Sequence, residues 1–318
     1  MENPVSRRCL FVGTVTRDIL MELEEPPASD RRLAARRVTP ASGGPAATAA
    51  AAFADLGGRG GLIAPVGRDE NGETVGRDLS ALDLAPLSLP VLDGPTAFSV
   101  ILVEPGGKRC IVHYGGCVQG LAPDLLTPEL LAGADVVHLA GMTGPQAVAL
   151  ARRCREVRPE AQLSVDGGNL DGPSLEALAG LSDLLVPDDK TVQKSLGLDP
   201  EAACRRFARL GVRLAAVTCG DQGSVALWDG ALHRIAACPV EALDTTGAGD
   251  NFHGALLYAL CRGDGPEAAL RLASAYAALT CTALGGRAAK PGLRRTEDLA
   301  RSVYETERKE DSPCPSSR

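Results

Sequence analysis

The 318-residue sequence lacks the features that mark membrane, secreted and nucleic-acid-binding proteins. No apolar run approaches the roughly 20 residues that a membrane-spanning helix needs. The first residues, Met-Glu-Asn-Pro, are not a basic segment followed by the long apolar stretch of a signal peptide. The net charge of -7 argues against nucleic acid as the main partner, because contact with phosphates needs a basic face. We therefore expect a cytoplasmic protein with no membrane and no nucleic-acid partner.

Histidine and aromatic residues are scarce, and the cysteines form no metal-binding motif. The chain has four His and ten Cys, with no C-x-x-C pair and no His at the spacing of a zinc site. We predict that most cysteines are reduced thiols in the core, since they fall in apolar runs. Aromatic residues make up only 3%, whereas Ala, Gly and Leu abound, which suits helices packed closely on a sheet. The length permits one large α/β domain or two small ones.

Short apolar runs alternate with helical patterns along most of the chain. Each run is bounded by glycine, proline or polar residues, which is typical of buried strands. Strands that alternate with helices predict right-handed crossovers and a mainly parallel sheet. The predicted strands lie at about 9–13, 62–66, 134–141, 162–166, 184–187, 214–218 and 224–228, with one of the intervening helices at 145–157.

Two apolar runs, 96–103 and 109–114, flank a Pro-Gly-Gly turn and predict a hairpin. The basic segment 31–38 has no helical stripe and is predicted to be a further strand beside it, so that the three make a small sheet, or lid. Because a lone hairpin is marginal in water, we expect substrate or a second subunit to cover one face, and hence a homodimer through the lid. The predicted organisation is a domain over 1–305 with lid segments at about 14–40 and 95–117, and a disordered tail over 306–318.

The densest motif is Asp-Thr-Thr-Gly-Ala-Gly-Asp-Asn-Phe-His-Gly, which ends in a helical apolar spacing. Gly247, Ala248 and Gly249 therefore lie at the mouth of a helix. Unpaired N–H groups and the helix dipole make such a mouth a site for an anion such as phosphate, and glycine leaves no Cβ in the way. Asp250 lies beside it in the first turn, where a carboxylate suits general-base catalysis of attack on a phosphoryl group. The alternative is an ordinary helix cap.

This motif closely resembles the C-terminal signature of the PfkB (ribokinase-like) family of carbohydrate and nucleoside kinases, and the resemblance spans about residues 12–291. It implies an α/β fold: a ribokinase-like three-layer α/β/α sandwich with a mainly parallel central sheet and a small β-sheet lid. It also implies ATP-dependent phosphorylation of a sugar hydroxyl, with Asp250 as the base and the amides of Gly247, Ala248 and Gly249 as the anion hole. The implied cofactors are ATP, Mg²⁺ and a monovalent cation such as K⁺.

A second motif, Ser-Gly-Gly-Pro-Ala-Ala-Thr, reads as a helix start with proline at the first position. It resembles the family's N-terminal signature Gly-Gly-x-Ala-x-Asn, which implies that Gly43 and Gly44 line the sugar site. Thr48 stands in place of the Asn. Asp18 is expected just past the end of the first strand, where such sheets bind ligands, although Asp is also common in turns. The resemblance implies that Asp18 holds substrate hydroxyls.

Two further segments are expected to contact the nucleotide. The Val-Thr-x-Gly-x-x-Gly run at 217–223 resembles the family segment that meets the phosphates and ribose, although a plain hairpin turn would show the same residues. The small-residue helix at 273–284 ends in Gly-Gly, a C-cap signal, and the resemblance implies an adenine pocket there with the monovalent-cation site after it. The residues implied to bind the nucleotide are Thr218, Gly220, Gly223, Ser274, Ala277 and Gly286.

The family motif Asn-x-x-Glu, whose side chains steer magnesium and its waters, is altered in this chain. Asp188 stands for the Asn, and Thr191 stands for the Glu. Magnesium would be held largely by nucleotide phosphates and water, so Asp188 is the candidate for steering those waters. The alteration also supports an alternative function, a sugar- or nucleoside-binding regulator on the same fold with weak catalysis.

The acceptor is defined by fewer residues. The Gly-Gly-Pro-Ala-Ala-Thr run and the later Cys-Thr-x-x-Gly-Gly-Arg-Ala run are most similar to the branch that includes sulfofructose kinase. This similarity implies an anionic ketose, and Arg32 is the candidate for contacting its charged group. A run of charges is more often a solvated face. Kinases of ketohexoses, ribose, 2-keto-3-deoxygluconate and nucleosides share both motifs and are kept as alternatives.

Overall fold

A nine-stranded sheet forms the centre of the protein in the computed structural model, which describes residues 5–104 and 108–310. Its strand order is β13-β12-β11-β10-β9-β8-β1-β4-β5, and all neighbours run parallel except β12, which is antiparallel to both β11 and β13. The strands are β1 (Arg8–Gly13), β4 (Arg59–Ile63), β5 (Leu84–Ser88), β8 (Val136–Ala140), β9 (Gln162–Asp166), β10 (Leu184–Val186), β11 (Leu214–Thr218), β12 (Ser224–Trp228) and β13 (Ala231–Ile235). The mainly parallel sheet predicted from the alternation of strands and helices is confirmed.

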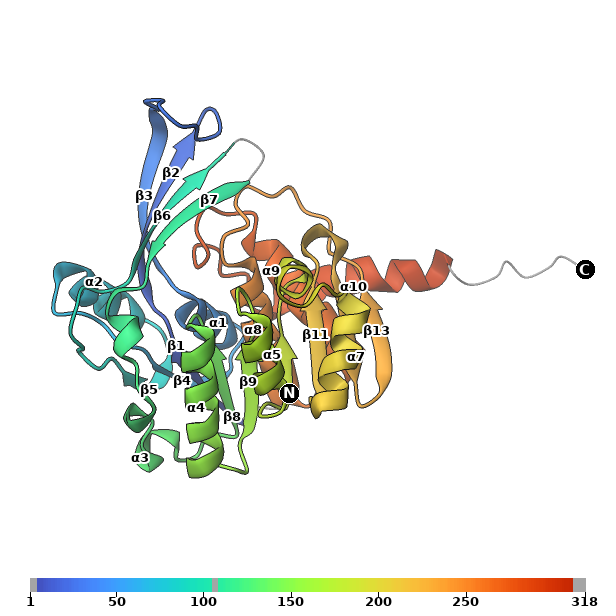
Figure 1. The fold of residues 1–318 in the computed structure, drawn as a ribbon. Helices are drawn as coiled ribbons and strands as arrows, with labels where there is room; N and C mark the ends of the chain where they lie inside the picture. The colour runs from blue at the N-terminus through green and yellow to red at the C-terminus, as the bar shows by residue number, and fades with distance from the viewer. Residues whose placement is uncertain (1–4, 105–107, 311–318) are drawn as a thin grey trace, which may run out of the picture.

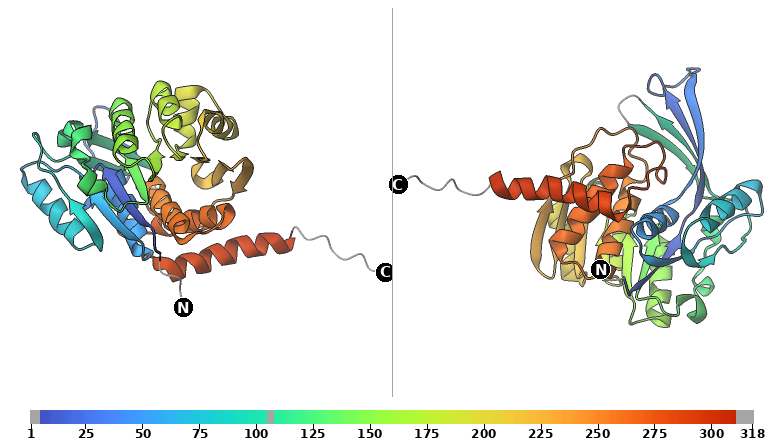
Figure 2. Two further views of the ribbon diagram at one scale, coloured as in Figure 1. Left: turned by 90° about the horizontal axis from the view of Figure 1, so that it is seen from below. Right: turned by 180° about the vertical axis from the view of Figure 1, so that it is seen from behind.

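Helices cover both faces of this sheet (Figure 1). One apolar core joins the sheet to α1, α2, α8 and α9, with a residue of α10, and a second joins it to α3–α7. Figure 2 shows the two sets of helices on opposite sides of the strands, which makes the predicted three layers. The helices are α1 (Pro45–Asp55), α2 (Glu70–Ser80), α3 (Pro128–Leu131), α4 (Gly144–Val157), α5 (Gly172–Ala179), α6 (Asp189–Leu196), α7 (Pro200–Leu210), α8 (Ala248–Arg262), α9 (Pro266–Thr280) and α10 (Gly292–Glu310).

A separate four-stranded sheet, the lid, projects from the body in Figure 1. Its order is β3-β2-β6-β7, and its strands are β2 (Thr16–Leu23), β3 (Ala35–Gly43), β6 (Phe98–Val103) and β7 (Arg109–Tyr114). The predicted hairpin is therefore present as β6 and β7. The predicted strand at 31–38 is placed too early, because β3 begins only at Ala35 and the first arginines lie in the preceding connection.

The α1 and α8 helices meet in the middle of the molecule at very short range. A methyl group on Gly254 would lie 2.2 Å from the carbonyl oxygen of Ala49 and 2.7 Å from the Cβ of Ala52. Alanine on α1 and glycine on α8 thus let the two backbones touch. Since α1 carries the second motif and α8 the first, this packing brings the two motifs together.

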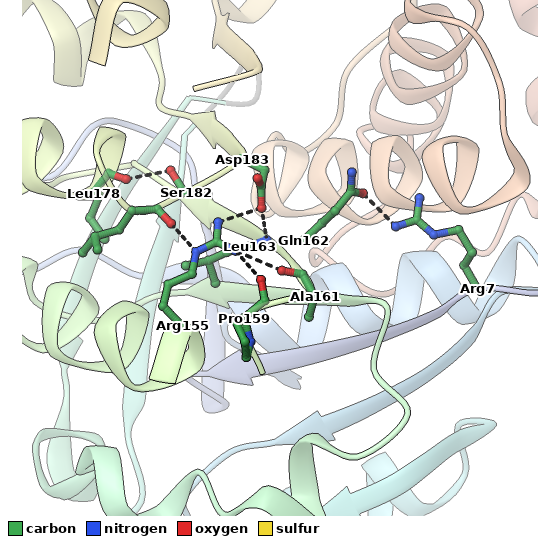
Figure 3. Close-up of polar contacts among 10 residues, drawn as sticks. Arg7, Arg155, Pro159, Ala161, Gln162, Leu163, Leu178, Ser182 and Asp183 are labelled. Carbon is green, nitrogen blue, oxygen red and sulfur yellow. Dashed lines mark hydrogen bonds and ion pairs between the residues drawn. The ribbon is translucent and has the colours of Figure 1, made fainter. Parts of the chain in front are cut away.

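The amino-terminal edge of the sheet is closed by a polar cluster around Arg155 of α4 (Figure 3). The Arg155 guanidinium donates to Asp183 Oδ2 at 2.7 Å and to the carbonyl oxygens of Leu181 at 2.7 Å and Ala161 at 3.0 Å. Asp183 Oδ2 also accepts from the Leu163 N–H at 2.7 Å. These contacts tie α4 to the connections that lead into β9 and β10. The candidate functional residues lie at the opposite edge, at the carboxyl ends of the strands.

The C-terminal helix α10 continues to Glu310, five residues into the segment for which disorder is expected, and residues 311–318 lie outside the described part. Nine cysteines are free thiols, and seven of them are buried, as predicted for core residues; Cys314 lies outside the described part. Within residues 5–104 and 108–310, no helix is both long and apolar enough to cross a membrane.

Candidate active site

The carboxyl ends of neighbouring strands bring several functional candidates to one edge of the sheet. Asp166 ends β9, Asp188 follows β10, and Thr218 ends β11. An isolated parallel bridge pairs Asp188 with Thr218. The predicted nucleotide segment and the altered magnesium motif are therefore adjacent at the carboxyl ends of the strands, where open α/β sheets bind ligands.

Helix α8 begins as predicted, directly after a glycine in the left-handed region. Gly247 has φ 72°, and no side chain caps the helix. The Ala248 N–H donates to the Thr245 carbonyl at 3.2 Å, so this amide is already engaged inside the turn. A Cβ built on Gly249 would meet no atom within 4 Å, so open space lies against this residue. The helix mouth thus offers room for an anion, with the Ala248 amide less available than predicted.

Asp250 lies in the first turn of α8, is partly exposed, and does not cap its own helix. Desolvation, together with the carboxylates of Asp166 and Asp18, raises the pKa of Asp250 to about 7 against the opposite effect of His253 and Arg109. A carboxyl group with this pKa exchanges a proton readily near neutral pH, which is the property a general base needs.

Asp18 is not in a turn after the first strand; it lies within lid strand β2, on the face that looks toward the site. Its register partners are Ser99 on β6 and, through Ser99, His113 on β7. Burial raises the pKa of Asp18, opposed by hydrogen bonds from Thr16 and Ser99, and its Oδ1 has no partner. The lid segment predicted over about 14–40 contains this residue, and the position expected just past the first strand belongs to β2 because β2 follows β1 after only two residues.

Gly43 of the second motif lies against Asp18, and Gly44 lies against the backbone of residues 14–16. A Cβ on Gly43 would sit 2.1 Å from Asp18 Oδ2, so only glycine allows this approach. Gly44 has φ 92° and precedes α1, whose first residue is Pro45. Thr48 is buried on α1, and a Cβ on Gly247 would be 3.3 Å from its Cγ2.

Gly286 lies beside the helix mouth. The Asn251 amide donates to the carbonyl oxygens of Gly247 at 2.9 Å and Gly286 at 2.8 Å. The Asp244 carboxylate also joins the two loops, because it accepts from Thr246 N–H and from Gly285 N–H, each at 2.8 Å. The loop after α9 therefore forms one wall of the mouth of α8.

The remaining nucleotide candidates lie on two separate segments. Thr218 and Gly220 are on the turn after β11, where a Cβ at Gly223 would be 2.0 Å from the Ile235 carbonyl oxygen, so Gly223 has a structural reason to be glycine. Ser274 and Ala277 lie on α9, and the Ser274 hydroxyl donates to the Ala236 carbonyl oxygen at 3.4 Å. The geometry places these residues without assigning them a ligand.

Asp188 caps α6. Its Oδ1 accepts from the Thr191 N–H and its Oδ2 from the Thr191 hydroxyl, each at 2.8 Å. The Asp-x-x-Thr sequence that replaces the family motif therefore makes a helix cap in which Thr191 donates both hydrogen bonds to the Asp188 carboxylate. In the described ranges 5–104 and 108–310 there is no group of three or more His, Cys, Asp or Glu that could hold a metal ion by itself.

The structure does not bring Arg32 to the site. This residue is exposed in the connection between β2 and β3. The register pairs Thr16 with Gly43 at the base of the lid and Leu23 with Ala35 at its tip, so this connection begins about 17 Å beyond Asp18 at roughly 3.3 Å per residue. This position at the tip of the lid gives no support to Arg32 as a substrate contact.

Two other arginines, missed in the sequence, do reach the site. Arg109 on β7 donates a hydrogen bond to the Thr245 hydroxyl, in the loop that leads into α8, and its charge acts on Asp250. Arg287 is half-buried, its charge acts on Asp18, and its Nη1 has no partner. Arg287 belongs to the Cys-Thr-x-x-Gly-Gly-Arg-Ala run noted in the sequence, but neither arginine is assigned a role there, because both reach the site through the folding of distant segments.

Comparison with known proteins agrees with this geometry. Residues 6–292 match the profile of the pfkB family carbohydrate kinases. The chain belongs to this family. It is 30% identical to the ATP-dependent ribose-1-phosphate kinase of Halopiger xanaduensis over 89% of this chain and 94% of the relative. It is 29% identical to the 2-dehydro-3-deoxygluconokinase of Thermoproteus tenax, covering 78% and 81%.

A solved structure shows the same fold. The ribokinase of Thermotoga maritima superposes with a TM-score of 0.78 at 23% identity, covering 93% of this chain and 99% of that one. The protein is thus a PfkB-family carbohydrate kinase with a ribokinase-like fold, as the two sequence motifs indicate. A solved structure of a putative ribokinase from E. coli, 22% identical to this chain with a TM-score of 0.77, is a complex with ATP and Mg²⁺.

Proposed function

We propose that the protein transfers the γ-phosphoryl group of ATP to a hydroxyl of a small sugar or sugar derivative, with Asp250 as the general base. The observation that carries the proposal is the carboxyl of Asp250, with its pKa raised to about 7, beside an uncapped helix mouth that has open space at Gly249. The acceptor hydroxyl gives its proton to Asp250 as its oxygen attacks phosphorus. The amides at the mouth stabilise charge on the phosphoryl oxygens.

The lid residues position the acceptor in this proposal. The buried Asp18 Oδ1 has no partner in the protein, so a sugar hydroxyl is a suitable donor for it, and Gly43 and Gly44 let the sugar approach the backbone. Arg109 joins the lid to the loop before α8 and so keeps the lid over the site. A covered site excludes water, which would otherwise accept the phosphoryl group.

The magnesium of the family fits this site in an indirect way. Mg²⁺ bound to ATP neutralises the phosphate charge. Asp188 lies beside Thr218 at the strand ends and, while capping α6, its oxygens keep further lone pairs for waters of the ion. For a monovalent cation, the loops joined by Asp244 are the proposed location, since the carbonyl oxygens of Gly247 and Gly286 lie close enough together to accept from the same Asn251 amide.

We further propose that the acceptor carries an anionic group. Arg109 and Arg287 bring two positive charges to the inner face of the lid, and the unpaired Nη1 of Arg287 leaves a buried donor for an anion. One relative named above is a ribose-1-phosphate kinase and another a 2-dehydro-3-deoxygluconokinase. An anionic ketose remains within this class, with these arginines in the place first assigned to Arg32.

We also propose that the protein forms a homodimer through the lid, because the outer face of the lid sheet is rich in apolar residues. The register puts Ile19, Met21, Val38, Val100 and Val112 on the face turned away from the site. Val38 and Val112 are 53% and 62% exposed. An apolar sheet face of this kind is a candidate protein interface, and a second copy of the lid matches it in shape and chemistry.

The alternative is a sugar- or nucleoside-binding regulator with weak catalysis, which the capping role of the altered Asp-x-x-Thr motif favours. An ATP-consumption screen over ribose-1-phosphate, 2-keto-3-deoxygluconate, sulfofructose, ribose, fructose and nucleosides separates the two. We expect turnover that Asp250→Asn abolishes and that Asp124→Asn, at an exposed position in the connection between β7 and α3, leaves intact. Stabilisation by a sugar without turnover would instead indicate a regulator.

The same screen tests the charge of the acceptor. Arg109→Gln and Arg287→Gln should raise KM for the charged acceptor by at least about tenfold, since each removes a charge-assisted hydrogen bond. Arg32→Gln should leave KM unchanged, because that side chain lies at the tip of the lid. Equal KM values for all three variants would contradict an anionic acceptor.

A further inference from the structure

A buried polar cluster lies directly beneath Asp250 and is not used by the mechanism above. His253 follows Asp250 by three residues on α8, so both side chains lie on the same face of the helix. His253 Nε2 is 3.5 Å from Asp166 Oδ1 at the end of β9. The ring of His253 lies against the ring of His138 on β8, with 5.0 Å between centroids. His138 Nδ1 is in turn 3.0 Å from the Ser164 hydroxyl.

The two histidines differ in charge because only one of them has an acidic partner. Burial alone would lower the pKa of His253, but the charge and hydrogen bond of Asp166, together with Asp250, raise it above its ordinary value. Burial, together with the neighbouring His253, lowers the pKa of His138 to about 3. The cluster therefore favours a protonated His253 beside the Asp166 carboxylate and a neutral His138.

The carboxylate of Asp166 disfavours the ionised form of Asp250, and a positive charge on His253 opposes that effect. Asp166 is held ionised, because His253 and the Gly168 N–H lower its pKa against the effect of burial. The charged groups that act on Asp250 are Asp166 from β9, His253 from α8, Arg109 from β7 and Asp18 from β2. Among them only His253 is both buried and bound to the opposing anion.

We propose that His253, kept protonated by Asp166, is a positioning residue that offsets the charge of Asp166 beside Asp250 and so keeps Asp250 ionised for catalysis. The inference rests on the proposed role of Asp250 as general base. Removing His253 alone leaves Asp166 as an uncompensated neighbour, which favours the neutral form of Asp250. Removing both His253 and Asp166 takes away one charge of each sign and restores the balance.

The pH dependence of kcat/KM tests this inference in the full-length protein. On the acid limb of the profile, kcat/KM falls at low pH as Asp250 takes up a proton. In His253→Gln, whose amide can still reach Asp166, the midpoint of this limb should rise by about one pH unit, and activity should be recovered at alkaline pH. His138→Asn is the matched control: it changes a neutral member of the cluster and should leave the limb in place. Adding Asp166→Asn to His253→Gln should return the limb toward its native position.

Two outcomes would overturn the proposal: an acid limb unchanged in His253→Gln, or a loss of activity that is the same at every pH. If a variant does not fold, nitrogen NMR of the histidine side chains in the native protein measures their protonation directly. It should show His253 protonated at pH 7 and His138 neutral, and a neutral His253 would contradict the proposal. If the native protein has no kinase activity on any acceptor, the proposed function itself fails, which is a different result from active enzyme with an unshifted limb.

Discussion

Asp250 combines two properties that oppose each other in a folded protein. Its position at the first turn of α8 suits proton transfer, yet the surroundings that raise its pKa to about 7 also make its charged form costly. Catalytic groups commonly sit where the chain tolerates such a cost. The residue should therefore reveal itself in stability measurements as well as in activity.

We predict that Asp250→Asn is more stable than the native protein at pH 8, by about 1–3 kcal/mol given the partial exposure of the side chain. The ordinary pKa is 3.8 and the folded value is about 7, so between these values the native state holds one proton more than the unfolded state. Native stability therefore falls as pH rises through this window, and the penalty persists above it. Urea unfolding at pH 4 and pH 8 measures the effect. The gain should vanish at pH 4, and equal stability at pH 8 would contradict the raised pKa.

Two glycines of the same helix should respond to alanine in opposite ways. A methyl at Gly249 meets open space, and alanine favours helix, so Gly249→Ala should fold at least as well as the native chain while losing activity at least about tenfold, because the methyl occupies the anion site. Gly254→Ala puts a methyl 2.2 Å from the Ala49 carbonyl and should cost several kcal/mol. Thermal unfolding and ATP consumption separate the two. Full activity in Gly249→Ala would move the phosphoryl site elsewhere.

At the residue scale, the sequence predicts the positions that depend on local geometry and misses those that depend on folding. The helix mouth at Gly247 and the carboxyl of Asp250 follow from spacing along one segment. Asp166 and His253 become partners only when β9 meets α8, and Arg109 reaches Thr245 only when the lid folds back. Arg32 is the converse case: a charge that is prominent in the sequence lies at the tip of the lid.

At the scale of elements, hydrophobic periodicity predicts the helices and strands of the body well. The helix expected at 145–157 is α4 (Gly144–Val157), and the apolar run 162–166 is β9. The lid strands are harder to place, since β3 carries mostly exposed residues and its start has no apolar pattern. Polar contacts at the ends of elements, such as those of Arg155, have no sequence signal.

The Arg155 cluster leads to a prediction about stability alone. Arg155→Met should destabilise the protein by about 2–4 kcal/mol, because it leaves the partly buried Asp183 carboxylate and several carbonyl oxygens without their donor (Figure 3). Arg152→Met, at an exposed position on the same helix, should change stability by less than about 0.5 kcal/mol. Activity per folded molecule should be unchanged in both, since the cluster is at the edge of the sheet opposite the strand ends. A loss of kcat in folded Arg155→Met would show that this edge is coupled to the site.

At the scale of the whole molecule, the lid has two faces with different chemistry. The inner face carries Asp18, Ser99 and Arg109, and it packs Leu20 and Ile101 against Leu284 of the body. The outer face carries Ile19, Met21, Val38, Val100 and Val112, and Val38 and Val112 are more than half exposed. The alternation of strand residues thus separates the residues proposed to position the acceptor from an exposed apolar surface.

We predict that Val112→Lys, at a 62% exposed position of the outer face, converts a dimer to a monomer. A lysine charge placed in an apolar interface loses its water without gaining a partner, and on a two-fold interface this happens twice. Light scattering after size exclusion gives the mass directly. Leu210→Lys, at a 39% exposed apolar position at the end of α7, is the control and should leave the mass unchanged. A native protein that is monomeric at every concentration would refute the interface.

If the dimer forms, the lid of each subunit is held by its partner. Val112→Lys should then also raise KM for the acceptor, because a lone lid sheet holds Asp18 less firmly over the site.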